Sequence, residues 1–127
     1  MTDMRTPLNR VRGLGSAKDG TGHFWRSRIT AVALLPLSLF AVGWVLSLRG
    51  AGYGEVRASL GHPLVALMLG LFILISLDHM RLGMQVIIED YVHGEGAKIV
   101  SLMLNIFFAG AVGAMTVFAI LKIAFGG

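Results

Sequence analysis

Residues 76–91 read Ser-Leu-Asp-His-Met-Arg-Leu-Gly-Met-Gln-Val-Ile-Ile-Glu-Asp-Tyr and follow directly on a run of apolar residues. Four charged side chains and one histidine interrupt the apolar pattern of a membrane helix in this stretch. Ionisable side chains in or at the edge of a membrane segment are costly, so each is a candidate for function. The candidates are Asp78, His79, Arg81, Glu89, Asp90 and Tyr91.

Three apolar runs predict three transmembrane helices. Residues 29–48 and 99–121 contain no charged side chain, and each matches the roughly 20 residues needed to cross about 30 Å of hydrocarbon. A third span covers 63–88 if its polar residues face protein. With 55% hydrophobic residues in a chain of 127, a soluble domain is excluded. The sequence therefore predicts an all-α membrane protein, with an N-terminal arm (1–28) before a three-helix transmembrane domain (29–127).

Basic residues are concentrated ahead of the first span. Six of the 11 arginine and lysine residues lie within residues 1–28. By the positive-inside rule we expect a cytoplasmic N-terminus and, after three spans, a C-terminus on the outer side. The first span is long and no small-residue cleavage site follows it, which indicates a retained helix and not a signal peptide. The positive charge then favours anionic lipid or an acidic partner over nucleic acid.

His79 shares a helical face with a glycine one turn later, Gly83. The missing side chain at Gly83 would let a flat macrocycle lie against the backbone beside the imidazole. His79 is therefore interpreted either as a hydrogen-bonded packing histidine or as an axial haem ligand. Asp78 and Arg81 at the same depth favour a cofactor, because polar groups there need partners from protein or cofactor.

A second metal ligand for the same site is missing from this chain. There is no cysteine, which excludes thiolate metal sites and covalent haem attachment. His62 and His93 lie seventeen and fourteen residues from His79, about 25 Å and 21 Å at the helical rise, and His23 is expected at the membrane edge. A second axial histidine would therefore come from another subunit.

The two ends of the predicted spans carry further candidates. Residues 22–28 form an interfacial cluster that either anchors the first helix in lipid or uses Arg28, and less directly Arg26 or His23, to neutralise carboxylates of a cofactor. At the end of the second span, Tyr91 could donate a hydrogen bond to a quinone carbonyl while Asp90 carries protons from water. The alternative for this pair is an interfacial tyrosine beside a helix-end acid.

The spacing His79-x3-Gly83-x6-Asp90-Tyr91 in the second of three helices resembles the smaller hydrophobic anchor (D) subunit of succinate dehydrogenase, respiratory complex II. The stretch Arg28-Ile-Thr-Ala at the start of the first span is similar to the family's arginine there. Length, number of spans and orientation agree, so the resemblance covers nearly the whole chain. The arginine-rich composition of residues 4–28 resembles that of alphaproteobacterial members of the family.

This resemblance implies a cofactor, a substrate and three partners. His79 would ligate a haem b shared with a second anchor subunit, and Arg28 would contact the haem propionates. Tyr91 would donate a hydrogen bond to ubiquinone, with Asp90 beside it in the quinone site. An iron–sulfur subunit and a flavoprotein subunit would dock on the cytoplasmic side of the bacterial inner membrane, so that this chain does not itself oxidise succinate.

Two other functions remain open from the sequence. One is the anchor of a fumarate reductase, the same architecture working with menaquinone. The other is a non-redox small membrane protein in which His79 and Asp90 form a proton or ion relay, with no cofactor and no obligatory soluble partner. The roles of His23 and His93 are also left open.

Overall fold

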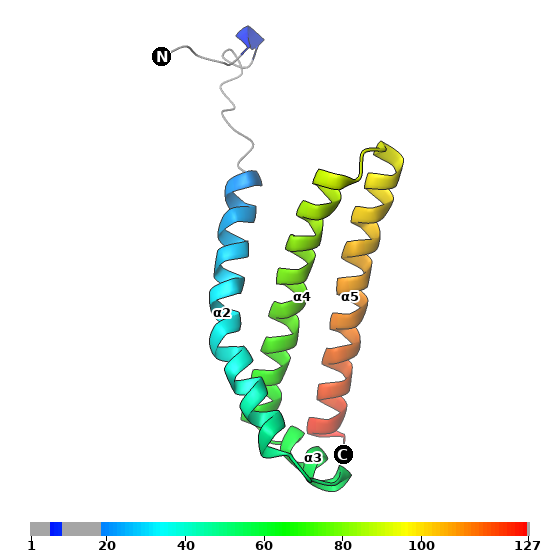
Figure 1. Ribbon diagram of the computed structural model, residues 1–127. Coiled ribbons are helices and arrows are strands. Elements are labelled where there is room, and N and C mark those ends of the chain that lie inside the picture. Colours follow the sequence, from blue (N-terminus) through cyan, green and yellow to red (C-terminus); the bar gives the residue numbers. More distant parts are fainter. Residues whose placement is uncertain (1–5, 9–18, 127) are drawn as a thin grey trace.

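The computed structural model describes residues 6–8 and 19–126. The described part contains the helices α2 (Asp19–Ser47), α3 (Tyr53–Leu60), α4 (Pro63–Tyr91) and α5 (Glu95–Phe125), labelled as in Figure 1, and no strand. Three of them, α2, α4 and α5, are long and apolar enough to cross a membrane. The predicted all-α class with three spans is confirmed.

Helix α4 is the central element of the bundle. It lies between α2 and α5 and packs against both, while the short α3 contacts α4 and α5 (Figure 1). The start of α2 and the α4–α5 connection lie at one end of the bundle, and α3 and the C-terminus lie at the other. Of the five buried hydrophobic residues in the described chain, four belong to α4: Ala66, Leu69, Leu82 and Ile88.

Helix α2 begins ten residues before the apolar run that predicted it. Residues 19–28 are helical, although they were expected to be the last part of an arm; of residues 1–18 only 6–8 are described. The extra turns are held against α4 by side chains of His23 and Arg26. An apolar run marks where a helix lies in hydrocarbon, and the helix itself continues as long as its polar turns find partners.

The connection between the first two spans is also more ordered than expected. The glycines at 50, 52 and 54 favour a turn, and Gly50 adopts φ 76°, a left-handed conformation that favours glycine. The chain then forms α3, two turns long, which is tied back to α2 because Trp44 Nε1 donates a hydrogen bond to Ser59 Oγ at 2.7 Å. His62 caps the start of α4, where its side chain accepts from the Leu64 N–H.

Small residues on α5 account for its close packing on α4. The sequence has two ridges of small residues, Ala109-x3-Gly113 and Gly110-x3-Ala114. Gly113 is buried, and a Cβ there would lie 3.5 Å from a methyl group of Leu74. A Cβ at Gly110 would meet nothing within 4 Å. The first ridge therefore packs within the chain, and the second faces outward.

Candidate functional site

His79 lies on the side of α4 that faces α2. It lines an open hollow of about 370 Å³ together with residues from the beginning of α2. The other residues that line this hollow, called the His79 hollow below, are His23, Phe24, Ser27, Arg28 and Ala31. The structure thus brings together His79, Arg28 and His23, all of which were candidates from the sequence.

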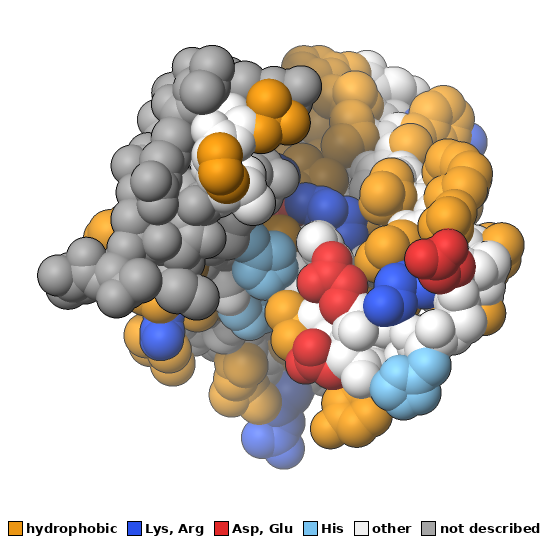
Figure 2. Space-filling view, turned by 90° about the horizontal axis from the view of Figure 1, so that it is seen from above, with side chains coloured by type: hydrophobic (Ala, Val, Ile, Leu, Met, Phe, Trp, Pro, Cys, Tyr) orange, Lys and Arg blue, Asp and Glu red, His pale blue; other side chains and the backbone are white. Residues whose placement is uncertain are grey.

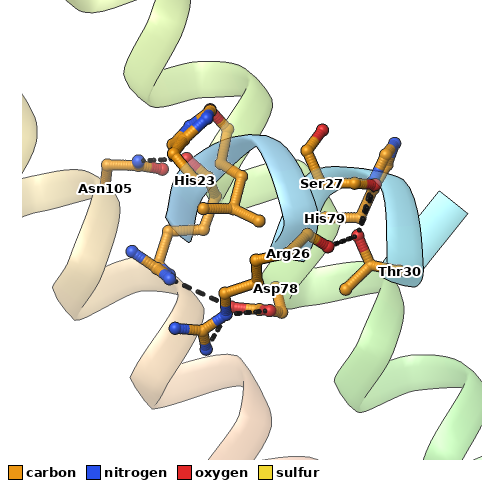
Figure 3. Close-up of polar contacts among 9 residues, drawn as sticks. His23, Arg26, Ser27, Thr30, Asp78, His79 and Asn105 are labelled. Carbon is orange, nitrogen blue, oxygen red and sulfur yellow. Dashed lines mark hydrogen bonds and ion pairs between the residues drawn. The ribbon is translucent and has the colours of Figure 1, made fainter. Parts of the chain in front are cut away.

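The imidazole of His79 is bonded to a buried threonine of α2. Thr30 is 8% exposed, and its Oγ1 lies 2.9 Å from His79 Nδ1. The same Oγ1 lies 2.8 Å from the backbone oxygen of Arg26 and 3.0 Å from that of Ser27. Figure 3 shows the edge of the His79 ring that carries Nδ1 turned toward Thr30. No described residue bonds to Nε2 of His79.

Asp78, next to His79 in the chain, is held by two arginines. Arg26 of α2 binds it through two hydrogen bonds of 2.8 Å and 2.9 Å, and Arg81 donates a third at 3.0 Å (Figure 3). Asp78 and Arg81 line a separate groove between α4 and α5, not the His79 hollow. Arg26 is therefore paired with Asp78. It does not line the His79 hollow, where it could bind a carboxylate of a cofactor.

Two further hydrogen bonds join the flanking helices to the α4 backbone at this depth. Asn105 of α5 donates through Nδ2 to the carbonyl of Arg81 at 2.9 Å. His23 Nε2 of α2 lies 3.3 Å from the carbonyl of Leu82, and because a carbonyl only accepts, His23 is the donor. Asn105 is a polar residue inside an apolar run, and its partner lies within the chain. All three spanning helices are therefore fixed to one another close to His79.

Arg28 has no carboxylate partner among the described residues. Its guanidinium lies 5.1 Å from the centroid of the Phe24 ring, a cation–π contact that holds it at the edge of the His79 hollow. An arginine placed there keeps its five N–H donors available for an anionic group of a ligand.

Asp90 and Tyr91 form a second, separate site. They end α4, both are exposed, and Tyr91 has 75% of its surface accessible. Neither is bonded to a described side chain, whereas the neighbouring Glu89 accepts a hydrogen bond from Gln85 at 3.0 Å. Tyr91 lies twelve residues from His79, about 18 Å at the helical rise. Figure 2 views this end of the bundle, where acidic, basic and histidine side chains gather.

The donor chemistry of the described residues limits what metal the chain can hold. No group of three or more His, Cys, Asp and Glu side chains comes together in residues 6–8 and 19–126. A closed metal site built by these residues alone is therefore absent. Within the described residues, His79 offers one imidazole nitrogen, Nε2, without a hydrogen-bond partner beside an open hollow.

Residues 2–120 match the family of succinate dehydrogenase/fumarate reductase transmembrane subunits. The chain belongs to this family. A succinate dehydrogenase hydrophobic membrane anchor subunit of Paracoccus denitrificans is 32% identical over 95% of this chain and 93% of its own length. A subunit of the same name from Rickettsia bellii is 34% identical over 71% and 72%, and a succinate dehydrogenase membrane anchor subunit of Reclinomonas americana is 36% identical over 68% and 75%. No solved structure matches the chain.

For this member of the transmembrane subunit family, sequence reasoning missed Thr30 and the pairing of Arg26 with Asp78. A signal for Thr30 was present, because it is one of three hydroxyl residues in the apolar run 29–48, and polar groups inside a span need partners. The pairing of Arg26 with Asp78 depends on how α2 and α4 are aligned, which neither segment reveals alone.

Proposed function

We propose that this chain is a membrane anchor subunit of a succinate:ubiquinone oxidoreductase, that it supplies one axial ligand of a haem b, and that it forms part of the quinone site. The observation that carries this proposal is the placement of His79, whose Nε2 is not bonded by any described residue and lies beside an open hollow in a chain of the succinate dehydrogenase/fumarate reductase transmembrane subunit family.

The residues around His79 fit a haem held between two subunits. Nε2 of His79 is the available ligand atom, and haem iron accepts imidazole nitrogen. A Cβ at Gly83, on the same face of α4, would meet nothing within 4 Å, so the backbone there is open to a flat ring. Arg28, with no carboxylate partner among the described residues, can bind a propionate. When bound, the haem supplies a one-electron carrier.

A hollow of about 370 Å³ is near the lower end of ligand-binding pockets, and this one is open. The remaining wall, and the second axial histidine, are assigned to another membrane anchor subunit. An iron–sulfur subunit and a flavoprotein subunit, which carry out succinate oxidation, complete the proposed complex.

Tyr91 and Asp90 are proposed to serve the quinone. Reduction of ubiquinone to ubiquinol requires two electrons and two protons. The electrons would come from the iron–sulfur subunit, while the Tyr91 hydroxyl donates a hydrogen bond to a quinone carbonyl oxygen and holds the head group. The exposed carboxylate of Asp90 would pass protons from water toward that oxygen. Exposure of both side chains at the end of α4 leaves them free for a ligand bound between subunits.

The membrane orientation proposed for the chain follows from its charges. The end that carries the start of α2 and the α4–α5 connection is assigned to the cytoplasm, and the C-terminus to the periplasm of a bacterial inner membrane. The soluble subunits would then dock beside Tyr91. Succinate oxidation is preferred to fumarate reduction because the Paracoccus, Rickettsia and Reclinomonas relatives are all named for succinate dehydrogenase.

The test is a reduced-minus-oxidised visible spectrum of the complex isolated from its native membrane through this chain. We expect a b-type α-band and co-purifying flavoprotein and iron–sulfur subunits. His79→Ala should abolish or alter the band, whereas His93→Ala, at an exposed position in the α4–α5 connection, should leave it unchanged. Absence of both haem and partners would overturn the proposal. Co-purification of the partner subunits without haem would support the complex but would show that His79 is a packing residue.

A further inference from the structure

The hydroxyl of Thr30 has one proton and three neighbours that could receive or supply one. Two of them are backbone oxygens, of Arg26 at 2.8 Å and Ser27 at 3.0 Å, and these can only accept. The third is Nδ1 of His79 at 2.9 Å, which can donate or accept according to the tautomer. The position of the hydroxyl proton therefore decides whether Nδ1 of His79 accepts or donates in this contact.

The two carbonyl contacts decide where that proton lies. If the hydroxyl donated to His79, its oxygen would face two carbonyl oxygens at 2.8 Å and 3.0 Å with no proton between them, which is repulsive. If it donates back to the carbonyl of Arg26, four residues earlier, the contact becomes the usual threonine bond within a helix. The lone pairs of Oγ1 then remain free, and they can be matched only by an N–H.

We infer that Thr30 is a positioning residue that holds His79 as the tautomer protonated at Nδ1, so that the Nε2 lone pair faces the His79 hollow. This inference rests on the proposed role of His79 as a haem ligand and extends it to the residue behind the ligand. A ligating histidine commonly donates its other ring N–H to an oxygen, which fixes the ring and makes the metal-binding nitrogen more basic.

The position of Thr30 suits this role. It is one of the few buried residues, and it belongs to α2, whereas the histidine belongs to α4. The acceptor is therefore carried by a different helix, and the imidazole orientation depends on α2 and α4 staying in register. The bonds from Arg26 to Asp78 and from His23 to the Leu82 carbonyl fix that register on either side of His79.

The test uses substitutions at Thr30 in the whole complex. Thr30→Val keeps the shape and removes the hydroxyl, Thr30→Ala removes the hydroxyl and a methyl group, and Thr30→Ser keeps the hydroxyl. We expect Val and Ala to raise the haem midpoint potential, because a less basic imidazole stabilises the oxidised iron less, and to weaken haem retention about 10- to 100-fold. Serine should restore wild-type values for both.

Thr116→Val is the matched control. Thr116 of α5 makes the same bond to the carbonyl four residues earlier, Val112 at 2.8 Å, but has no hydrogen bond to a histidine among the described residues. This variant should leave the haem potential and the low-spin electron paramagnetic resonance signal unchanged. It separates loss of the threonine bond within a helix from loss of the bond to His79.

Each outcome decides the inference. A wild-type haem potential and resonance signal in Thr30→Val and Thr30→Ala would overturn the inference. A haem potential raised in Thr30→Ser as much as in Thr30→Val and Thr30→Ala would also overturn it, because the methyl group and not the hydroxyl would then be required. If Val and Ala lose haem while Ser keeps it, the hydroxyl is required and the inference holds. Failure of the proposed function looks different: the unmodified complex lacks haem, or His79→Ala keeps its spectrum.

Discussion

His79 and Tyr91 belong to the same helix, yet their surroundings differ. The His79 imidazole is held from behind by Thr30 and faces the hollow against α2, whereas Tyr91 ends α4 with three quarters of its surface exposed. About 18 Å of helix separates them, as the rise per residue requires. The proposed haem and quinone functions should therefore respond independently to substitution.

Tyr91→Phe should lower the ubiquinone reductase activity of the isolated complex about tenfold or more. The reason is the loss of a hydrogen bond to an oxygen that gains charge during reduction, worth about 1.5–3 kcal/mol. The haem spectrum should not change. Tyr53→Phe, at the only other tyrosine and at the opposite end of the bundle, should keep full activity. Normal turnover in Tyr91→Phe would remove the role assigned to it.

For single residues, the sequence alone was sufficient to relate candidates that lie on the same helix. His79, Gly83, Asp90 and Tyr91 are related by helical spacing, and the structure places all four on α4. Thr30 could not be assigned a role in this way, because its partner lies 49 residues further along the chain. Which residue of α2 meets His79 depends on the alignment of two helices.

Among the elements, α4 is held from both sides by polar side chains. Arg26 and His23 reach it from α2, and Asn105 reaches it from α5. Where water is excluded, such bonds have few competitors, and they specify one alignment of helices that apolar packing alone would leave loose. The described residues include no buried side-chain N or O without a partner. These polar contacts of α2 and α5 with α4 therefore set the geometry of the His79 hollow.

The pair of Arg26 and Asp78 should be coupled in stability. Arg26→Met and Asp78→Asn should each lower the temperature at which half of the complex has lost this chain, because Arg26→Met removes two of the three hydrogen bonds that Asp78 accepts from described residues, and Asp78→Asn takes the carboxylate away from both arginines. The double variant should lie close to Asp78→Asn alone, because Arg26→Met removes only a contact that Asp78→Asn has already weakened. Arg49→Met is the control, because Arg49 is exposed, lies outside the His79 hollow and has no bond to Asp78. Additive effects of Arg26→Met and Asp78→Asn would show that the pair contributes nothing jointly.

The elements that sequence reasoning misplaced are those whose helicity comes from neighbours. Glycines on both sides of Tyr53 favour a turn, but α3 is stabilised by its contacts with α4 and α5 and by the bond from Trp44 to Ser59. Residues 19–28 contain few apolar residues in a helical pattern, yet their bonds to α4 make them part of α2. Tertiary contacts of this kind commonly override local propensity.

For the whole molecule, the chain buries little of its apolar surface. Only five hydrophobic residues of the described chain are buried, while large apolar side chains of all three long helices point outward. Lipid accounts for part of this exposure. The outward-facing ridge that contains Gly110, together with the open His79 hollow, gives other membrane helices places for close approach. This agrees with an anchor that functions within a complex and not alone.

The charge distribution predicts how the whole chain crosses the membrane, and its lack of cysteine makes this directly measurable. Seven of the 11 basic residues fall in residues 1–28 or in the α4–α5 connection and first turn of α5, whereas Arg49, Arg57 and Lys122 lie toward the other end. In intact spheroplasts, Glu55→Cys should react with a membrane-impermeant maleimide, because α3 would face the periplasm. Glu95→Cys should react only after permeabilisation, with denatured samples as the control for total thiol. Labelling of Glu95→Cys but not of Glu55→Cys in intact spheroplasts would show the opposite topology. Tyr91 would then lie on the side opposite the proposed soluble subunits.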